Sequence, residues 1–289
     1  MDKFISYAQN CEDVMLWRAL RGVTPGYYID IGANHPVLDS VTKSFYDRGW
    51  HGMNVEPIKS LYEQLVLERP NDINLCCAVS STIGRTAFYD VAGTGLSTIE
   101  PSVGEGHAGL GYDVRTYEVP VFTLTDLFDR YNVTVVHFLK IDVEGAEKKV
   151  LEGMPFDRVM PWIIVVEGTR PNTQIPSYAD WEPIITSCGY SFVYFDGCNR
   201  YYVSAAHLEL ALSFHAPPNA FDDYVNYRDW SAQQELRKDL AAVRKELSVN
   251  QMRVAKMRAS WSWRLTKPLR GLGLLVHCVL GKWRRSHHK

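Results

Sequence analysis

The chain has 289 residues, of which 46% are hydrophobic and 22% charged, values typical of a soluble globular protein with one large core and appendages. No apolar run approaches the ~18 residues that span a bilayer, and Met1–Lys3 does not begin a secretory signal, so we expect a cytoplasmic protein. The six cysteines include no Cys-x-x-Cys pair, which argues for reduced thiols and against structural zinc.

Charge is divided unevenly along the chain. Residues 1–246 hold all 33 acids but only 21 of the 31 bases, a formal charge of −12, and the other ten bases follow Glu246. An acidic body and a basic tail with separate roles are therefore predicted.

The first predicted element is an N-terminal capping helix within residues 1–22. Asn10 is expected to be its N-cap, with Asp13 three residues later and an apolar face from Val14 onward. Because this helix precedes the first strand, we expect it to pack across the ligand cleft as a lid. Gln9 and Glu12 either face the ligand or serve only as capping groups.

The stretch Tyr27–Pro36 is predicted to be a buried parallel strand whose carboxyl end opens into a ligand site. Asp30 is expected at the strand tip, and Gly32 allows the backbone to approach a ligand closely. A second apolar strand, Met53–Pro57, also ends in an acid, Glu56. Two strand-end acids about twenty residues apart suit a nucleoside, with the second acid accepting hydrogen bonds from ribose hydroxyls.

The turn after the first strand indicates which nucleoside is bound. A dinucleotide site normally has three glycines, whereas this turn has one, followed by Asn34, His35 and Pro36. Asp30 would repel a pyrophosphate and suits a cation, such as the amino group of S-adenosylmethionine. We therefore predict a methyl-donor site that includes Asp30, Gly32, Asn34 and Glu56. A dinucleotide site, or a strand and turn in which Asp30 only caps a helix, are the alternatives.

Helices are predicted over residues 41–48 and 59–68, and a third strand over 73–79, after which Ser80 is expected to touch the adenine edge. The alternation of strands and helices then stops. Strands over 84–90 and 115–121 flank a glycine-rich loop, and a loop of this length is usually functional or disordered.

This loop is expected to bind the acceptor substrate, with Ser97, Glu105 and His107 as contacts. A flexible connecting loop without a binding role is the alternative.

The next elements restore the alternation. They are a helix capped by Thr123 that runs to Tyr131, a strand over 135–142, a helix over 145–153, a strand over 162–167, a helix over 181–188 and hairpin strands over 191–196 and 200–204. This order predicts an α/β fold for residues 23–215. We expect a three-layer sandwich around a seven-stranded, mostly parallel sheet, with the site at the carboxyl ends of the strands.

Acids at the ends of the later strands are candidates for catalysis. Asp142 and Glu144 are predicted general bases for a hydroxyl acceptor, and His35 is a third candidate because imidazole titrates near neutral pH. Alternatively, Asp142 and Glu167, which end neighbouring strands, hold Mg²⁺ against the acceptor hydroxyl. Asp142 and Glu144 are otherwise structural caps.

Two runs are specific enough to indicate a family. They are Ile-Asp-Val-Glu-Gly-Ala-Glu at 141–147 and Gly-Trp-x-Gly-x-Asn-Val-Glu-Pro at 49–57. With Asn10–Asp13, they resemble the FkbM family of S-adenosylmethionine-dependent methyltransferases over residues 5–205. The resemblance implies a class I, Rossmann-like methyltransferase fold and O-methylation, often of a sugar or polyketide hydroxyl.

A linker and a helix are predicted for residues 216–259, as a helical extension of the fold. Its apolar residues recur at alternating intervals of four and three: Leu236, Leu240, Val243, Leu247, Asn250, Val254 and Met257. This spacing is typical of a coiled-coil seam, in which Asn250 would fix the register. We expect a homodimer through residues 236–257, and packing of the helix against the body is the alternative.

Residues 260–289 are predicted to be a basic amphipathic tail. Ser260–Arg270 resembles a short tail on bacterial enzymes of surface-polysaccharide assembly, including glycosyltransferases. The apolar run 272–280, flanked by Trp and Arg, suits peripheral contact with the inner face of an anionic membrane and argues against a nucleic-acid partner. A disordered basic tail is the alternative.

The predicted function is O-methylation, from S-adenosylmethionine, of a sugar hydroxyl on a glycan or glycolipid precursor. O-methylation of a polyketide-like small molecule is one alternative. A catalytically silent scaffold with the same fold is the other.

Overall fold

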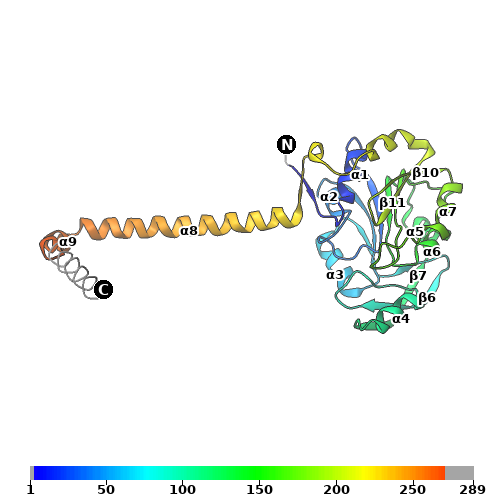
Figure 1. The fold of residues 1–289 in the computed structure, drawn as a ribbon, viewed down its shortest axis with the longest axis horizontal. Coiled ribbons are helices and arrows are strands. Elements are labelled where there is room, and N and C mark those ends of the chain that lie inside the picture. The colour runs from blue at the N-terminus through cyan, green and yellow to red at the C-terminus, as the bar shows by residue number, and fades with distance from the viewer. Residues whose placement is uncertain (1–2, 271–289) are drawn as a thin grey trace, which may run out of the picture. The chain divides into compact units, whose positions relative to one another are not determined.

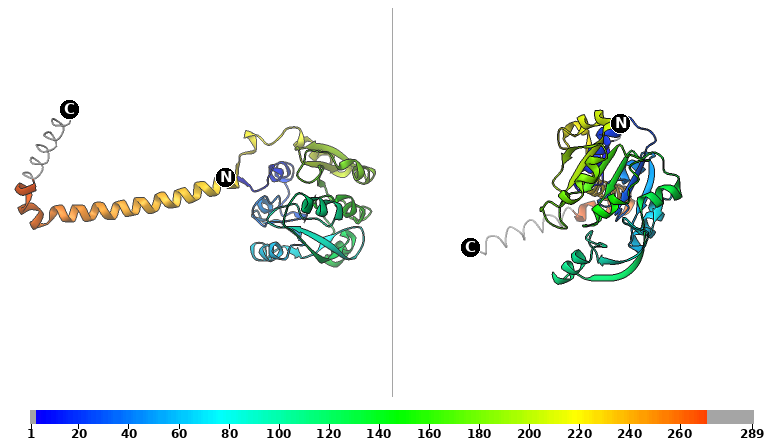
Figure 2. Two further views of the ribbon diagram at one scale, coloured as in Figure 1. Left: turned by 60° about the horizontal axis from the view of Figure 1, so that its bottom comes forward. Right: turned by 90° about the vertical axis from the view of Figure 1, so that its right-hand side faces the viewer.

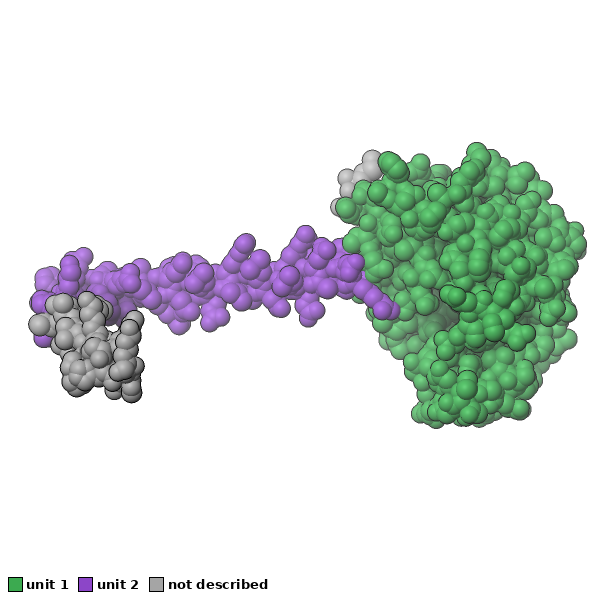
Figure 3. Space-filling model, in the orientation of Figure 1, with its two compact units in different colours: residues 1–227 green, residues 228–289 purple. Residues whose placement is uncertain are grey.

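The computed structural model of the protein describes residues 3–270. The chain divides into two units, residues 1–227 and 228–289 (Figures 1 and 3). The apolar run 272–280 and the last four bases of the predicted tail lie outside the described residues.

A seven-stranded sheet lies at the centre of the first unit, with strand order β10-β11-β9-β8-β2-β3-β4. The strands are β2 (Tyr27–Ile31), β3 (His51–Val55), β4 (Ile73–Leu75), β8 (Phe138–Ile141), β9 (Ile163–Glu167), β10 (Tyr190–Phe195) and β11 (Asn199–Ser204). Neighbours from β9 to β4 are parallel, whereas β11 is antiparallel to both β9 and β10. The sheet is therefore mixed, because the predicted terminal hairpin adds two antiparallel pairings to the parallel strands.

Helices cover both faces of this sheet. They are α1 (Glu12–Leu20), α2 (Lys43–Tyr46), α3 (Lys59–Glu68), α5 (Leu124–Tyr131), α6 (Glu147–Glu152) and α7 (Glu182–Ser187). One core cluster joins α5, α6 and α7 to Ile29 and Ile31 of β2, and the other joins α1 and α2 to Tyr28. The alternation of side chains along β2 thus supplies both cores. The predicted helix over 41–48 shortens to the four residues of α2.

The N-terminal segment differs from the prediction. A short strand, β1 (Phe4–Ser6), pairs with β12 (Tyr224–Asn226), so the first unit extends beyond the expected boundary at residue 215. Cys11, in a left-handed conformation, is the residue at the N-cap of α1, and the predicted cap at Asn10 is wrong. The apolar side of α1 packs on the sheet as part of the core, while Glu12 at its first position borders the cavity.

A three-stranded sheet and a helix replace the expected strand and loop between residues 73 and 122. The predicted strand 73–79 is broken at Cys76 and Cys77, because β5 (Ala78–Val79) leaves the main sheet and pairs with β7 (Val114–Phe122). The latter pairs with β6 (Gly84–Val91) as a long hairpin. The glycine-rich segment between them contains α4 (Pro101–Gly109), which projects with the hairpin from the body (Figure 2).

The second unit contains α8 (Tyr227–Ala259) and α9 (Trp261–Leu265). The predicted helix over 236–257 lies within α8, and the apolar seam residues are exposed in the single chain. Among residues 3–270, no helix combines the length and hydropathy needed to cross a membrane.

Candidate active site

A cavity of about 1130 Å³ opens at the carboxyl ends of β2, β3, β8 and β9. Its volume is slightly above the range of about 300–1,000 Å³ that is usual for small-molecule sites. Seven lining side chains are carboxylates, namely Glu12, Asp39, Glu56, Asp90, Asp142, Glu144 and Glu167. Only Lys140 and Arg115 are basic among the described lining residues. This imbalance favours a cationic ligand over a phosphorylated one.

Most of the predicted site residues line this cavity. They are Gly32, Asn34, His35, Glu56, Ser97, Asp142, Glu144 and Glu167, together with Gln9 and Glu12. The segment 92–99, between β6 and α4, forms another wall. Four predicted contacts do not line the cavity: Asp30, Ser80, Glu105 and His107.

Gly32 makes the turn after β2 possible. Its backbone has φ +82°, and its N–H donates to the carbonyl of Val55 over 3.0 Å. A Cβ at this position would lie 1.9 Å from the carbonyl oxygen of Asp142. Only glycine therefore allows the first turn to pass over the end of β8.

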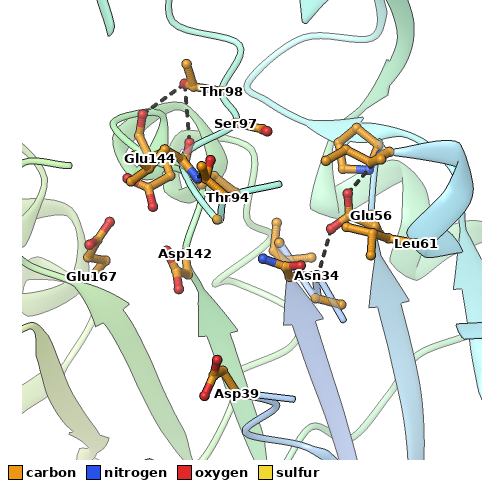
Figure 4. Close-up of a pocket in the computed structure, with 18 of the residues that line it drawn as sticks. Asn34, Asp39, Glu56, Leu61, Thr94, Ser97, Thr98, Asp142, Glu144 and Glu167 are labelled. Carbon is orange, nitrogen blue, oxygen red and sulfur yellow. Dashed lines mark hydrogen bonds between the residues drawn. The ribbon is translucent and has the colours of Figure 1, made fainter. Parts of the chain in front are cut away.

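Glu56 follows β3 and fixes the turn after β2, which contains Gly32 and Asn34 and is called the cofactor turn. Its Oε2 accepts a hydrogen bond from the Asn34 N–H and its Oε1 one from the Ile58 N–H, both over 2.8 Å (Figure 4). Burial raises the pKa of Glu56 to about 7, although these hydrogen bonds oppose the shift. Each oxygen retains a second lone pair, which suits the predicted ribose hydroxyls.

Asp30 lies beneath the cavity wall, which differs from the predicted direct ligand contact. In the sheet it is flanked by Asn54 and Lys140. Its Oδ2 accepts a hydrogen bond from Thr42 Oγ1 over 3.0 Å, and its Oδ1 lies 3.5 Å from Lys140 Nζ. Side chains alternate along β2, so Asp30 lies on the other face of the sheet from Ile29 and Ile31. Those two residues belong to the core cluster that contains α5, α6 and α7.

Lys140 links the turn at Gly32 to the acid Asp142 after β8. This role was not predicted from the sequence. Its Nζ lies 3.3 Å from Asp142 Oδ2 and donates to the carbonyl of Gly32 over 3.4 Å. Burial opposes the charged form, but Asp30 and Asp142 outweigh it and raise the pKa of Lys140, which stays protonated. A lysine inside an otherwise apolar strand was the available sequence signal.

His35 caps its own loop. Its Nδ1 accepts hydrogen bonds from the N–H groups of Val37 and Leu38, over 3.0 and 2.9 Å. Because Nδ1 accepts both hydrogen bonds, the neutral ring carries its proton on Nε2, and burial, which lowers the pKa of His35, favours this neutral form. That nitrogen is a donor, which argues against the predicted general-base role of His35.

The other predicted contacts are displaced by the local fold. Ser80 follows β5, which pairs with β7 in the small sheet, and its N–H donates to the carbonyl of Phe122. Glu105 and His107 belong to α4, away from the cavity. Ser97 is the predicted loop contact that lies on the wall.

Three carboxylates meet on the opposite side of the cavity from Glu56 (Figure 4). Asp142 and Glu144 follow β8 and Glu167 ends β9, and each offers an oxygen within 4.8 Å of the others. Burial, followed by the charge of Asp142, raises the pKa of Glu144 to about 9 and that of Glu167 to about 11. The predicted acids thus form a compact cluster.

Glu12 provides a test of the electrostatics at the cavity edge. It accepts hydrogen bonds from the Asn10 N–H and Asn199 Nδ2, over 2.8 and 3.0 Å, and burial with the charge of Asp196 raises its pKa from 4.5 to about 8. A raised carboxyl pKa stabilises the fold below 4.5, and this contribution is lost as pH rises through 8.

In Glu12→Gln this pH dependence is expected to disappear. Between about pH 6 and about pH 9 the wild-type free energy of unfolding should fall by about 2–3 kcal/mol relative to the variant. Urea unfolding at both pH values measures this difference. The exposed Glu63→Gln is the control, and equal pH dependence in wild type and Glu12→Gln would contradict the assignment.

The fold and the site define a class of protein. Acids and a glycine turn at the carboxyl ends of parallel strands are typical of α/β enzymes that bind a nucleoside cofactor. A model of the methyltransferase FkbM domain matches residues 30–192, more than half of the chain. The protein belongs to the FkbM methyltransferase family, as its two motif runs predicted. The family makes it a methyltransferase, with S-adenosylmethionine as the implied methyl donor. A search of curated proteins found no match.

Proposed function

We propose that the protein transfers a methyl group from S-adenosylmethionine to a hydroxyl group of a glycan or glycolipid precursor. The observation that carries the cofactor assignment is the cavity with seven carboxylates, with Glu56 and the Gly32 turn on one side. A sulfonium cofactor is positively charged, and a positive charge beside these buried carboxyls lowers their raised pKa values and favours the ionised form. Gly32, Asn34 and Glu56 hold the cofactor, while Asp30 positions Lys140 from below the wall.

Bound S-adenosylmethionine supplies a methyl group that is already activated, so the protein mainly has to align the acceptor. Alignment supplies roughly 7–11 kcal/mol of the barrier, and a general base adds about 10²–10⁴-fold. Of the two predicted bases, Asp142 is supported by the Lys140 ammonium 3.3 Å away, which keeps a counter-charge beside the carboxylate. Glu144 is the second candidate, and Mg²⁺ held by Asp142 and Glu167 is the alternative route.

The cavity charge also supports a neutral acceptor group. A sugar ring can enter a cavity lined by carboxylates, whereas phosphates of a lipid-linked precursor are better kept outside it. A polyketide-like hydroxyl has the same neutral character and is the alternative acceptor. A catalytically silent scaffold is disfavoured by the intact acids, since such a protein has no need to bury them around a cavity.

Calorimetry with S-adenosylhomocysteine tests the cofactor assignment. Glu56→Gln leaves one of the two backbone N–H groups, Asn34 or Ile58, without its carboxylate oxygen. The affinity is expected to fall about 10–100-fold, because a hydrogen bond to a charged group contributes about 1.5–3 kcal/mol. Glu63→Gln, on the exposed side of α3, should bind like wild type. No binding by wild type, or unchanged affinity in Glu56→Gln, would contradict the proposal.

The second unit is proposed to pair with a second copy of the chain and to bring the enzyme to the inner face of the membrane. The exposed seam of α8 supports pairing, and the basic residues after Glu246 support contact with anionic lipid. A membrane-bound precursor would then be the natural acceptor, and the enzyme would be cytoplasmic and peripheral.

Two variants separate these roles. Leu240→Glu combined with Leu247→Glu is expected to give monomers by light scattering, while Met252→Glu, outside the seam, stays dimeric. A chain that lacks residues 260–289 should stay dimeric but no longer sediment with vesicles that contain anionic lipid. Monomeric wild type, or unchanged sedimentation of the shortened chain, would contradict the respective role.

A further inference from the structure

The carboxylate cluster formed by Asp142, Glu144 and Glu167 has the dimensions of a cation site. Metal–oxygen distances of about 2.1–2.4 Å place oxygens on opposite sides of one ion about 4.2–4.8 Å apart. The three side chains offer oxygens that all lie within 4.8 Å of one another. One ion would therefore reach all three carboxylates with small side-chain movements.

The backbone holds this cluster in place before any ligand binds. Glu144 adopts φ +53°, a conformation that costs a non-glycine residue energy, and Thr98 Oγ1 donates to its carbonyl over 2.9 Å. Glu147 Oε1 accepts hydrogen bonds from the N–H groups of Val143 and Gly145, over 3.3 and 3.0 Å. The turn after β8 is thus fixed from both sides, which is typical of a preorganised site.

Among residues 3–270, two of the three carboxylates, Glu144 and Glu167, form no ion pair. Glu144 is only 8% exposed, and its Oε2 and that of Glu167 have no hydrogen-bond partner among residues 3–270. In the same part of the chain, the ion pairs of Lys140 reach Asp142 and Asp30 but neither glutamate. Buried carboxylates without a partner are costly, so these oxygens are suited to a ligand that brings positive charge.

We propose that Asp142, Glu144 and Glu167 bind one divalent cation, of the hard class that includes Mg²⁺ and Mn²⁺. Hard cations of this kind prefer ligand sets made only of oxygen, such as these three carboxylates. Metals that prefer thiolate or imidazole ligands would find none in this cluster. Binding of the ion requires nothing beyond this cluster. Its role rests on the proposed function and takes the place of a protein base: the ion would coordinate the acceptor hydroxyl, lower its pKa and orient it, and the hydroxyl proton would pass to solvent as the oxygen takes the methyl group from the sulfonium.

Manganese titration of the full-length protein tests the site directly. With neither cofactor nor acceptor present, electron paramagnetic resonance should show one Mn²⁺ bound per chain, with a dissociation constant below about 1 mM. Glu144→Gln and Glu167→Gln should each weaken binding more than about tenfold, since one charged ligand is lost. Asp90→Asn removes a carboxylate from the same cavity but outside the cluster, and should leave the affinity within about twofold of wild type.

Thermal melting shows whether each variant is folded, and Mn²⁺ should raise the melting temperature of wild type and Asp90→Asn only. Absence of saturable binding to wild type, or equal affinity in Glu144→Gln and Glu167→Gln, overturns the proposal. Weaker S-adenosylhomocysteine binding in both variants without Mn²⁺ binding by wild type also overturns it, and assigns the cluster to the cofactor's amino group. Because cofactor binding is measured separately through Glu56, failure of the metal site leaves the proposed function standing, and the reverse also holds.

Discussion

Replacement of Gly32 by alanine is expected to lower the free energy of unfolding by about 3–5 kcal/mol and to abolish detectable S-adenosylhomocysteine binding. The φ of +82° alone costs an alanine about 1–2 kcal/mol. The new Cβ would also lie 1.9 Å from the carbonyl oxygen of Asp142, so backbone must move. Overpacking of this kind costs about a further 1–3 kcal/mol or more, which accounts for the rest of the expected loss in the free energy of unfolding. The movement would displace both the cofactor turn and the acid cluster.

Gly49→Ala is the matched control for this substitution. Gly49 has φ +83°, but within residues 3–270, its chain neighbours aside, no atom lies within 4 Å of the position of its Cβ. We therefore expect only the conformational cost, about 1–2 kcal/mol, and unchanged ligand affinity. Urea unfolding and calorimetry of both variants separate strain from collision. Equal destabilisation by the two substitutions would show that the contact between the turn and Asp142 is not tight.

The sequence was sufficient to predict the strands that carry the site. β2, β3, β8 and β9 are almost wholly buried, so each is a mainly apolar run that ends at a turn or an acid, although β2, β3 and β8 each contain an internal polar residue, Asp30, Asn54 and Lys140. Parallel order then brings their carboxyl ends to one edge, which is why Glu56, Asp142 and Glu167 were expected at one site, Glu56 beside the cofactor and the other two beside the acceptor. The capping of α5 by Thr123 was also predictable, because it depends only on local spacing.

The remaining features depend on contacts between distant segments. The strand over 73–79 breaks because β5 pairs with β7, about forty residues later, and no local pattern marks that exchange. β1 is only three residues long and is defined by its pairing with β12 at the other end of the first unit. The position of Asp30 beneath the cavity wall depends on distant contacts too: strand alternation determines which face of the sheet it lies on, but its partners there, Thr42 and Lys140, are known only from the packing.

The buried Arg69 is another feature that depends on contacts between distant segments, and its replacement is expected to destabilise the protein strongly. Arg69, at the C-cap of α3, is fully buried. Its guanidinium donates hydrogen bonds to the carbonyl of Pro36 and to the hydroxyls of Ser40 and Thr42. The loop that it ties down continues from the cofactor turn, and Thr42 in turn donates to Asp30. Arg69 therefore supports the site from below, although the sequence shows only a basic residue at the end of a helix.

Arg69→Met is expected to destabilise the protein by about 3–5 kcal/mol, because the apolar side chain leaves several buried acceptors without their donor. Where the variant remains folded, its S-adenosylhomocysteine affinity should also fall, since Leu38 and Asp39 of the released loop line the cavity. Arg158→Met is the control: that residue pairs with Asp129 on the surface, where solvent screens the charges, so its loss should change the free energy of unfolding far less and leave binding unchanged. Urea unfolding gives the first quantity and calorimetry the second. If Arg69→Met matched Arg158→Met in both, the polar network beneath the turn would not be what holds the cofactor loop in place.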